Sequence, residues 1–212
     1  MTIQKKTSET DLGPVRLKRK IGSEQFKYNN EPQKATLLNF WQWSSSDLIS
    51  NSLRGILAEF IVAMAVGKHD GVSGGWNAYD LITNNGIKVE VKSAAYIQSW
   101  YQKTFSKIVF SIRETRAWSA ETNILDKQSM RQADIYVFAL FKYQGKKEIA
   151  DPMNLNQWVF YVISTKRFEK NHKKAKSITL AKLEKLQPIK CSYKRLNRYI
   201  LLEAYKKDSL PD

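Results

Sequence analysis

Apolar residues recur at the spacing of one helix face between residues 47 and 66. The stripe comprises Leu48, Ile49, Leu53, Ile56, Leu57, Phe60, Ile61 and Met64. This i, i+3, i+4 pattern is typical of a helix packed against a core. Ser44, Ser45 and Ser46 are N-cap candidates, and Gly67 is placed to end the helix. The pattern therefore predicts a core helix in whose C-terminal half Glu59 is the only charged residue.

Shorter apolar runs with a period of two predict strands farther along the chain. Residues 79–83 and 87–93 flank Asn84-Asn85-Gly86, which is typical of a hairpin turn. Three more runs of strand length cover residues 107–112, 135–141 and 158–164. The sequence therefore predicts a sheet that begins with a hairpin.

The remaining segments predict how helices surround this sheet. The polar stretch 114–132 is long enough for a crossover helix, and helical patterns at 178–186 and 193–206 follow the last strand. The order of elements predicts an α/β fold with a mixed central sheet flanked by helices. We expect a loosely ordered basic arm over residues 1–35, a core over 36–165 and a basic helical C-terminal extension over 166–212.

The alternation of side chains in the hairpin fixes its register. Because a one-residue slip moves every side chain to the other face, the apolar pattern must match across the pair. A two-residue loop would place Asp80 opposite Val91 and mix charged with apolar residues. A three-residue loop with a left-handed Gly86 places Asp80 opposite Glu90, with Cβ atoms about 4.5–5.5 Å apart. The pattern favours this second register, in which Lys92 shares the face of Glu90.

The net positive charge of the chain indicates which class of molecule it binds. The chain has 35 Lys and Arg against 20 Asp and Glu, a net charge of +15. Residues 164–198 alone carry twelve basic and two acidic side chains. Such a surface attracts polyanions through phosphate contacts, which favours nucleic acid over a merely solvated basic face or an acidic membrane surface.

The compartment follows from what the sequence lacks. The start, MTIQKKTSET, has no apolar signal region, and the longest apolar run, residues 55–67, is too short to cross a bilayer. Cys191 is the single cysteine, so an internal disulfide is excluded. We expect a cytoplasmic protein with no membrane partner.

The candidate chemistry centres on Glu90-Val91-Lys92, the only acidic-x-Lys triplet in the chain. Two neighbouring carboxylates, Asp80 and Glu90, repel each other unless a cation or a proton lies between them. A hard divalent ion with oxygen ligands fits best, so we expect Mg²⁺, with Mn²⁺ as an alternative. His69 and His172 are the only histidines, which leaves little material for a zinc site or a histidine-based triad.

Glu59 on a helix, Asp80 on a strand and Glu90-x-Lys92 on its hairpin partner resemble the PD-(D/E)xK nuclease superfamily, which has a restriction-endonuclease-like core. The resemblance covers roughly residues 47–165, and Tyr79 stands where the motif name has proline. The segments SLRGILAEFIVAMAVG, YDLITNNGIKVEVKSAAYIQSW and RQADIYVFAL also resemble an uncharacterised bacterial group within the superfamily.

The resemblance implies a metal-dependent hydrolysis of phosphodiester bonds, with DNA as the substrate. Asp80 and Glu90 would bind Mg²⁺, with the Val91 carbonyl as a third ligand and Glu59 acting directly or through water. The metal would acidify water and polarise the phosphate. Lys92 would orient the attacking water or stabilise charge on the phosphate.

Each assignment has an alternative. Glu90 and Lys92 could form a surface ion pair, Asp80 could begin a turn, and Glu59 could pair with Arg54 on the helix surface. For the whole chain, the alternatives are a non-catalytic nucleic-acid-binding protein on a nuclease-like scaffold, or an interaction protein whose basic tail binds an acidic partner.

Candidate DNA contacts lie beside the predicted site. Trp100, Gln102 and Lys103 follow the catalytic strand, where they could stack on bases, reach into the site and contact phosphate, or belong to the core and its edge. Arg54 lies on the helix before Glu59 and could bind a phosphate or simply cap the helix face. Cutting two strands needs two centres or two visits, so a homodimer is also an open expectation.

Overall fold

A computed structural model of the chain describes residues 12–74, 77–172 and 174–206, without the side chains of 171 and 172. The strands are β1 (Gln25–Tyr28), β2 (Glu31–Thr36), β3 (Leu81–Ile82), β4 (Lys88–Ala95), β5 (Val109–Ser111), β6 (Trp118–Ser119), β7 (Ile124–Leu125), β8 (Ile135–Phe141), β9 (Trp158–Ser164), β10 (Ser177–Thr179) and β11 (Ile189–Cys191). The α-helices are α1 (Leu37–Ser45), α2 (Asn51–Ala65), α3 (Thr165–His172), α4 (Leu180–Lys185) and α5 (Leu196–Ala204).

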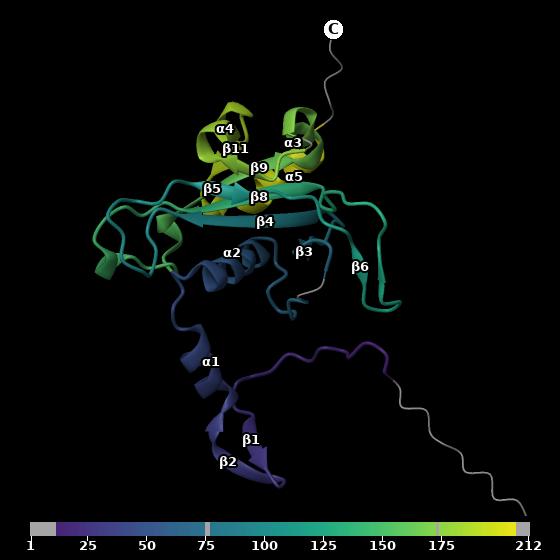
Figure 1. Ribbon diagram of the computed structural model, residues 1–212, viewed down its shortest axis with the longest axis vertical. Helices are drawn as coiled ribbons and strands as arrows, with labels where there is room; N and C mark the ends of the chain where they lie inside the picture. The colour runs from purple at the N-terminus through teal and green to yellow at the C-terminus, as the bar shows by residue number, and fades with distance from the viewer. Residues whose placement is uncertain (1–11, 75–76, 173, 207–212) are drawn as a thin grey trace, which may run out of the picture.

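A five-stranded sheet in the order β11-β9-β8-β4-β3 forms the centre of the molecule (Figure 1). β4 and β8 run parallel, while the other three neighbouring pairs run antiparallel. Every residue of β8 is buried, because β8 lies in the middle of the sheet and both of its faces are covered. The predicted mixed α/β architecture is therefore confirmed.

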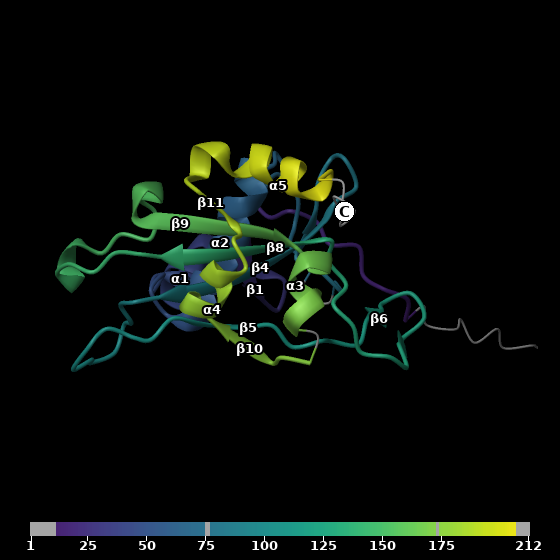
Figure 2. The same cartoon turned by 90° about the horizontal axis from the view of Figure 1, so that it is seen from above.

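The two faces of the sheet carry separate cores. α2 and α5 pack against one face, where Ala58, Val91 and Ile200 belong to the same buried cluster (Figures 1 and 2). On the other face, α3, α4 and the β5–β10 ribbon cover a second cluster that includes Phe138 and Phe168. Because odd-numbered residues of β4 face the first core, Glu90 and Lys92 point to the opposite side of the sheet.

The predicted core helix is shorter at its start than expected. α2 begins at Asn51, because the Asp47 carboxylate accepts the backbone N–H of Ser50 in a turn before the helix. Ser44 and Ser45, which the sequence offered as caps, end the separate helix α1. Gly67 follows α2 with a φ of +68°, as expected of a residue that ends a helix.

The crossover helix expected within residues 114–132 is absent, and this segment is fully described. It contains the small β6–β7 hairpin, with Asn123 in the left-handed region. Residues 120–130 are all exposed, so the segment has no apolar face that a helix could bury. β4 and β8 are thus joined by a long connection of strands and loops.

Both ends of the chain differ from the expectation. Residues 1–11 lie outside the described part, but the segment expected to be loosely ordered contains the β1–β2 hairpin. At the other end, the expected extension is integral to the domain, because β11 pairs with β9, and Leu196 and Ile200 are fully buried in the first core. The local helical period of 193–206 gave no indication of this docking.

Within the described residues, no helix is both long and apolar enough to cross a bilayer.

Candidate active site

The β3–β4 hairpin has the three-residue loop that the apolar pattern favoured. Leu81 pairs with Val89, and Ile82 pairs with Lys88. Gly86 adopts a φ of +78°, which glycine reaches without steric cost, and so closes the loop. The predicted register is confirmed, and it places Asp80 beside the strand that carries Glu90.

Asp80, which directly precedes β3, accepts a backbone hydrogen bond from β4 beyond the paired part of the hairpin. β3 pairs with β4 only at Val89 and Lys88, and no other described strand continues the pairing on that side. The N–H of Val91 is instead donated to Oδ2 of Asp80 at 2.6 Å. This bond holds the carboxyl of Asp80 against the backbone between Glu90 and Lys92.

Glu90 and Lys92 lie side by side on β4. The Lys92 ammonium donates to Oε1 of Glu90 and forms an ion pair with it. The side chains are 18% and 29% exposed for Glu90 and Lys92, so solvent and a substrate can still reach the pair. The alternation of β4 therefore brings a carboxyl and an amine to one partly open edge, as predicted.

Glu59 approaches from α2. It lines the same cavity as Asp80, a space of about 310 Å³ between α2, the loop that follows it and β3. Leu81 and Phe60 supply apolar wall, and the Glu59 side chain is half-buried. Glu59 and Asp80 thus share one cavity, and Glu90 and Lys92 lie close enough for their charges to act on Glu59.

The electrostatics of this cluster favour protons or a cation. Burial, then repulsion from Asp80, raise the pKa of Glu59 to about 7, against which the charge of Lys92 acts. Burial also raises the pKa of Asp80, although the Val91 N–H opposes this, and burial and Asp80 together raise the pKa of Glu90. A single ammonium therefore does not offset three partly buried acids.

The acids do not form a ready-made metal cage. Within the described residues, no group of three or more His, Cys, Asp or Glu side chains is arranged to hold an ion. Asp80 is engaged by the Val91 N–H, and Glu90 by the Lys92 ammonium. The ammonium thus occupies one of the oxygens that a cation would need.

A family model for the bacteriophage T4 endonuclease IV matches residues 4–187 of the chain. The chain belongs to the bacteriophage T4 endonuclease IV family. The match covers β3, β4, β8 and β9 of the central sheet, α2 and all four residues of the cluster, so membership supports a nuclease that acts on DNA. No match was found among curated proteins or among solved structures.

Arg54, expected as a DNA contact, is buried and holds several hydrogen-bond partners in place. Its guanidinium donates to the Ile49 carbonyl at 2.7 Å, to Asn51 Oδ1 at 2.6 Å, to Gln98 Oε1 at 3.2 Å and to Ser93 Oγ at 3.3 Å. Burial lowers its pKa. The side chain of Arg54 therefore ties α2 to the end of β4, and its burial does not favour the expected phosphate contact.

Gln102 also turns away from the role expected of it. Its Oε1 accepts the Gln98 N–H at 2.6 Å, and its Nε2 donates to the Tyr96 carbonyl and to Ser106 Oγ, both at 3.1 Å. Gln102 thus folds the loop after β4 rather than reaching into the site. Gln98, which the sequence did not single out as a partner, joins this loop to Arg54 and is buried.

The aromatic residues of the same loop are exposed. Trp100, Tyr101 and Phe105 all have more than half of their surface accessible, and Lys103 is exposed. The Lys147 ammonium donates to the Trp100 carbonyl and attaches the loop to the β8–β9 connection. Trp100 therefore lies at the edge of the domain and not in its core, while stacking on bases by Trp100 and phosphate contact by Lys103 stay predictions.

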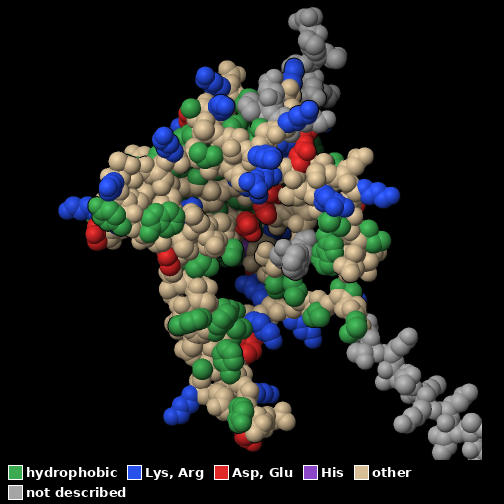
Figure 3. Space-filling view, viewed as in Figure 1, with side chains coloured by type: hydrophobic (Ala, Val, Ile, Leu, Met, Phe, Trp, Pro, Cys, Tyr) green, Lys and Arg blue, Asp and Glu red, His purple; other side chains and the backbone are tan. Residues whose placement is uncertain are grey.

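The basic C-terminal region covers the side of the molecule away from α1. Its exposed members are Lys166, Lys170, Lys174, Lys176, Lys182, Lys185, Lys190, Lys194, Arg195 and Arg198. In Figure 3, Lys and Arg side chains gather over α3 and α4, and acidic side chains gather below them at the level of β4 and α2. Basic surface thus borders the acidic centre, as expected of a protein that must hold a polyanion near carboxylates.

Proposed function

We propose that the chain is a divalent-metal-dependent DNA endonuclease of the PD-(D/E)xK type, with Glu59, Asp80, Glu90 and Lys92 as its active-site residues. The observation that carries the proposal is the gathering of three acids with raised pKa values and one amine at the unpaired edge of β4. This set occurs in a chain that belongs to an endonuclease family. The mixed sheet agrees with a restriction-endonuclease-like core.

The donor set fits Mg²⁺, or Mn²⁺ in its place. Mg²⁺ takes oxygen ligands, keeps several waters and is commonly held by one or two carboxylates together with substrate phosphates. Asp80 and Glu90, with the Val91 carbonyl, would hold it, and Glu59 would complete the set directly or through water. Because water and substrate phosphates supply the remaining ligands, the protein does not need to provide all of them. When bound, the metal supplies a Lewis acid for the phosphate and acidifies water.

Lys92 is the residue that brings a positive charge to the proposed active site. Its ammonium already hydrogen bonds to a carboxylate oxygen, so a phosphate oxygen at this edge meets a donor of the same kind. With a cation held by Glu90, the Lys92 ammonium would be free to orient the attacking water or to stabilise charge on the phosphate. Lys92 is thus the residue whose loss should affect cleavage more than binding.

Glu59 is suited to accept a proton. Its pKa of about 7 lies near neutral pH, where a carboxyl exchanges protons most effectively as a general base. It lines the same cavity as Asp80, so a water bound there would lie within reach of both carboxyls. In this proposal Glu59 takes the proton of the attacking water.

A cleavage assay tests the proposal. Metal-stripped protein is incubated with supercoiled plasmid and with single-stranded DNA, with and without Mg²⁺ or Mn²⁺. We expect cleavage only with metal, lost in Asp80→Ala and Lys92→Ala and retained in Lys88→Ala, which alters an exposed lysine of the same strand. Salt-sensitive DNA binding without cleavage would instead support a non-catalytic nucleic-acid-binding protein, and neither binding nor cleavage would contradict both.

A further inference from the structure

The β1–β2 hairpin and α1 form an arm that projects from the body of the protein (Figure 1). Thr36 caps α1 by accepting the Asn39 N–H, and the Asn39 side chain accepts the Thr36 N–H in return. Leu38 and Trp41 close over Gly22, whose φ of +93° brings the backbone against them. The arm is therefore a small folded unit with its own local contacts.

The arm leaves an unusual amount of apolar surface uncovered. No residue of α1 is buried. Six large apolar side chains of the arm are exposed: Phe26, Tyr28, Leu38, Phe40, Trp41 and Trp43. Helices of this length and isolated hairpins are marginal in water, so such a unit needs a partner to cover it.

The exposed area approaches what a stable interface needs. The six side chains are between 37% and 86% exposed and together present roughly 600 Å² of apolar surface over the whole arm, against about 800 Å² per partner in a standard interface. Trp43 is 86% and Phe40 44% exposed, and their i, i+3 spacing places both on one side of the helix. These two residues are therefore the natural centre of a contact.

The charge of the arm helix indicates what covers it. α1 contains no Lys, Arg, Asp or Glu, which makes it a poor surface for phosphates. The whole chain carries +15, so two copies repel each other wherever their basic surfaces meet. α1 is a surface on which two copies can meet without bringing like charges together.

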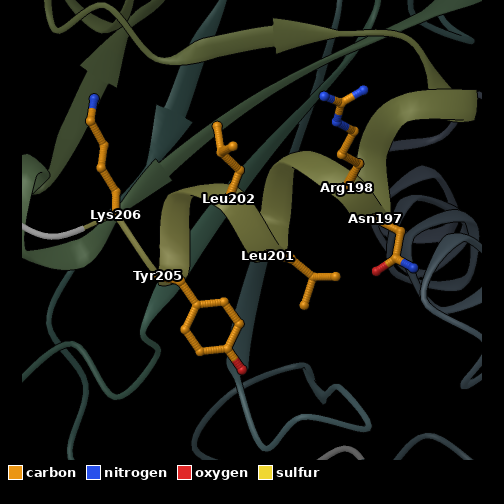
Figure 4. A pocket seen from close by; sticks show the side chains of 6 residues that line it. All are labelled: Asn197, Arg198, Leu201, Leu202, Tyr205 and Lys206. Atoms are coloured by element: carbon orange, nitrogen blue, oxygen red, sulfur yellow. The ribbon is translucent and has the colours of Figure 1, made fainter.

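Another apolar surface, on α5, lacks this property. A hollow of about 770 Å³ there includes Leu201, Leu202 and Tyr205, but Arg198 and Lys206 border it (Figure 4). Two copies joined through α5 would place these cations against each other.

We propose that the chain forms a twofold homodimer in which the apolar side of α1 packs against α1 of a second copy. This inference does not depend on the proposed active site.

Mass measurement of the full chain by light scattering tests the dimer. We expect a mass near twice 24.6 kDa, shifting toward 24.6 kDa in Phe40→Ser/Trp43→Ser, with at least a 10-fold weaker dimer. Tyr101→Ser removes another exposed aromatic side chain and should leave the dimer unchanged. Thermal melting of each variant checks that the body remains folded. A wild-type chain that is monomeric at about 100 μM, or a double variant that dimerises as well as the wild type, would overturn the proposal.

Cross-linking provides a second test that does not weaken the arm helix. Cys191 is buried, so an added cysteine is the only accessible one among the described residues. Ser44→Cys changes an exposed residue of α1 beside Trp43 and should form a disulfide-linked dimer on oxidation, because Ser44 borders the proposed Phe40–Trp43 contact. Met153→Cys, which is also exposed but lies outside the arm, should not. Equal cross-linking of both variants, or loss of DNA binding in the double variant with an unchanged mass, would contradict the α1 contact.

Discussion

The Asp80 carboxylate accepts the Val91 N–H at 2.6 Å, which fixes an acidic side chain at the point where the hairpin partner of β4 ends. Glu90 and Lys92 flank Val91 directly in the same strand. A single hydrogen bond thus determines where the carboxyl of Asp80 lies relative to the acid–lysine pair, and the predictions below follow from that arrangement.

Asp80→Asn separates the structural role of Asp80 from its charge. The amide oxygen of Asn can still accept the Val91 N–H, so we expect a melting temperature within a few degrees of the wild type. Loss of the anionic ligand should lower the cleavage rate by at least about 100-fold. Asp134→Asn is the matched control, because Asp134 accepts the Lys88 N–H at 2.8 Å at the start of the same strand. Equal losses in both variants would indicate a structural effect.

Glu59→Gln should change the pH dependence of stability in the absence of metal. The pKa of Glu59 is about 7 in the folded chain and near its ordinary value of 4.5 when unfolded, so folding takes up a proton between these pH values. Below pH 4.5 the carboxyl is neutral in both states, and above about pH 7 its ionisation destabilises the fold. Because the group is only half-buried, screening limits the effect to about 1 kcal/mol, or roughly 2–4 °C.

Chelator-treated wild type and Glu59→Gln are compared by thermal melting from pH 4 to 9. We expect equal stability at the acidic end and a more stable variant above pH 7. Glu148→Gln, a change of an exposed acid, should follow the wild type at every pH. A Glu59→Gln variant that is less stable than the wild type at high pH would show that the ionised carboxylate is favoured by its surroundings.

Lys92→Met should separate metal binding from cleavage. The ammonium occupies an oxygen of Glu90, so its removal leaves that carboxylate free for a divalent ion. We expect Mn²⁺ to raise the melting temperature of the variant at least as much as that of the wild type, while cleavage is lost. Lys88→Met should retain both properties. Loss of the Mn²⁺-induced shift in Lys92→Met would mean that Lys92 supports the metal site and does not compete with it.

Arg54→Met should destabilise the fold. The change leaves Asn51 and Gln98 without a donor and removes the link between α2 and Ser93, at a cost of about 2–4 kcal/mol. We expect the melting temperature to fall by roughly 5–15 °C, with DNA affinity at low temperature nearly unchanged. Arg113→Met replaces an exposed arginine and is the control for charge. A stable Arg54→Met variant with weakened DNA binding would restore Arg54 as a contact.

The hairpin shows why part of the site was predictable from the sequence. Apolar and charged residues alternate strictly in β4, and Gly86 lies in the turn. Only one register keeps apolar side chains on one face of the hairpin and charged side chains on the other, and the structure has that register. These are local rules that apply to adjacent segments. The position of Asp80 relative to Glu90 followed from them without knowledge of the rest of the fold.

The failures of the sequence analysis concern contacts between distant segments. Arginine commonly binds phosphate, so the sequence suggested this role for Arg54. Its partners Ser93 and Gln98 lie about 40 residues away in the chain, and only the packing of α2 on β4 brings them to it. The docking of α5 and the pairing of β11 likewise depend on β9. No local period distinguishes a terminal helix that docks from one that extends into solvent.

A Mn²⁺ titration, followed by electron paramagnetic resonance of metal-stripped protein, tests the central claim most directly. We predict one bound ion per chain in the wild type, no detectable binding in Asp80→Asn/Glu90→Gln, and unchanged binding in Asp134→Asn. A wild-type chain that binds no Mn²⁺, or a double variant that binds it as tightly as the wild type, would contradict a metal centre at the edge of β4.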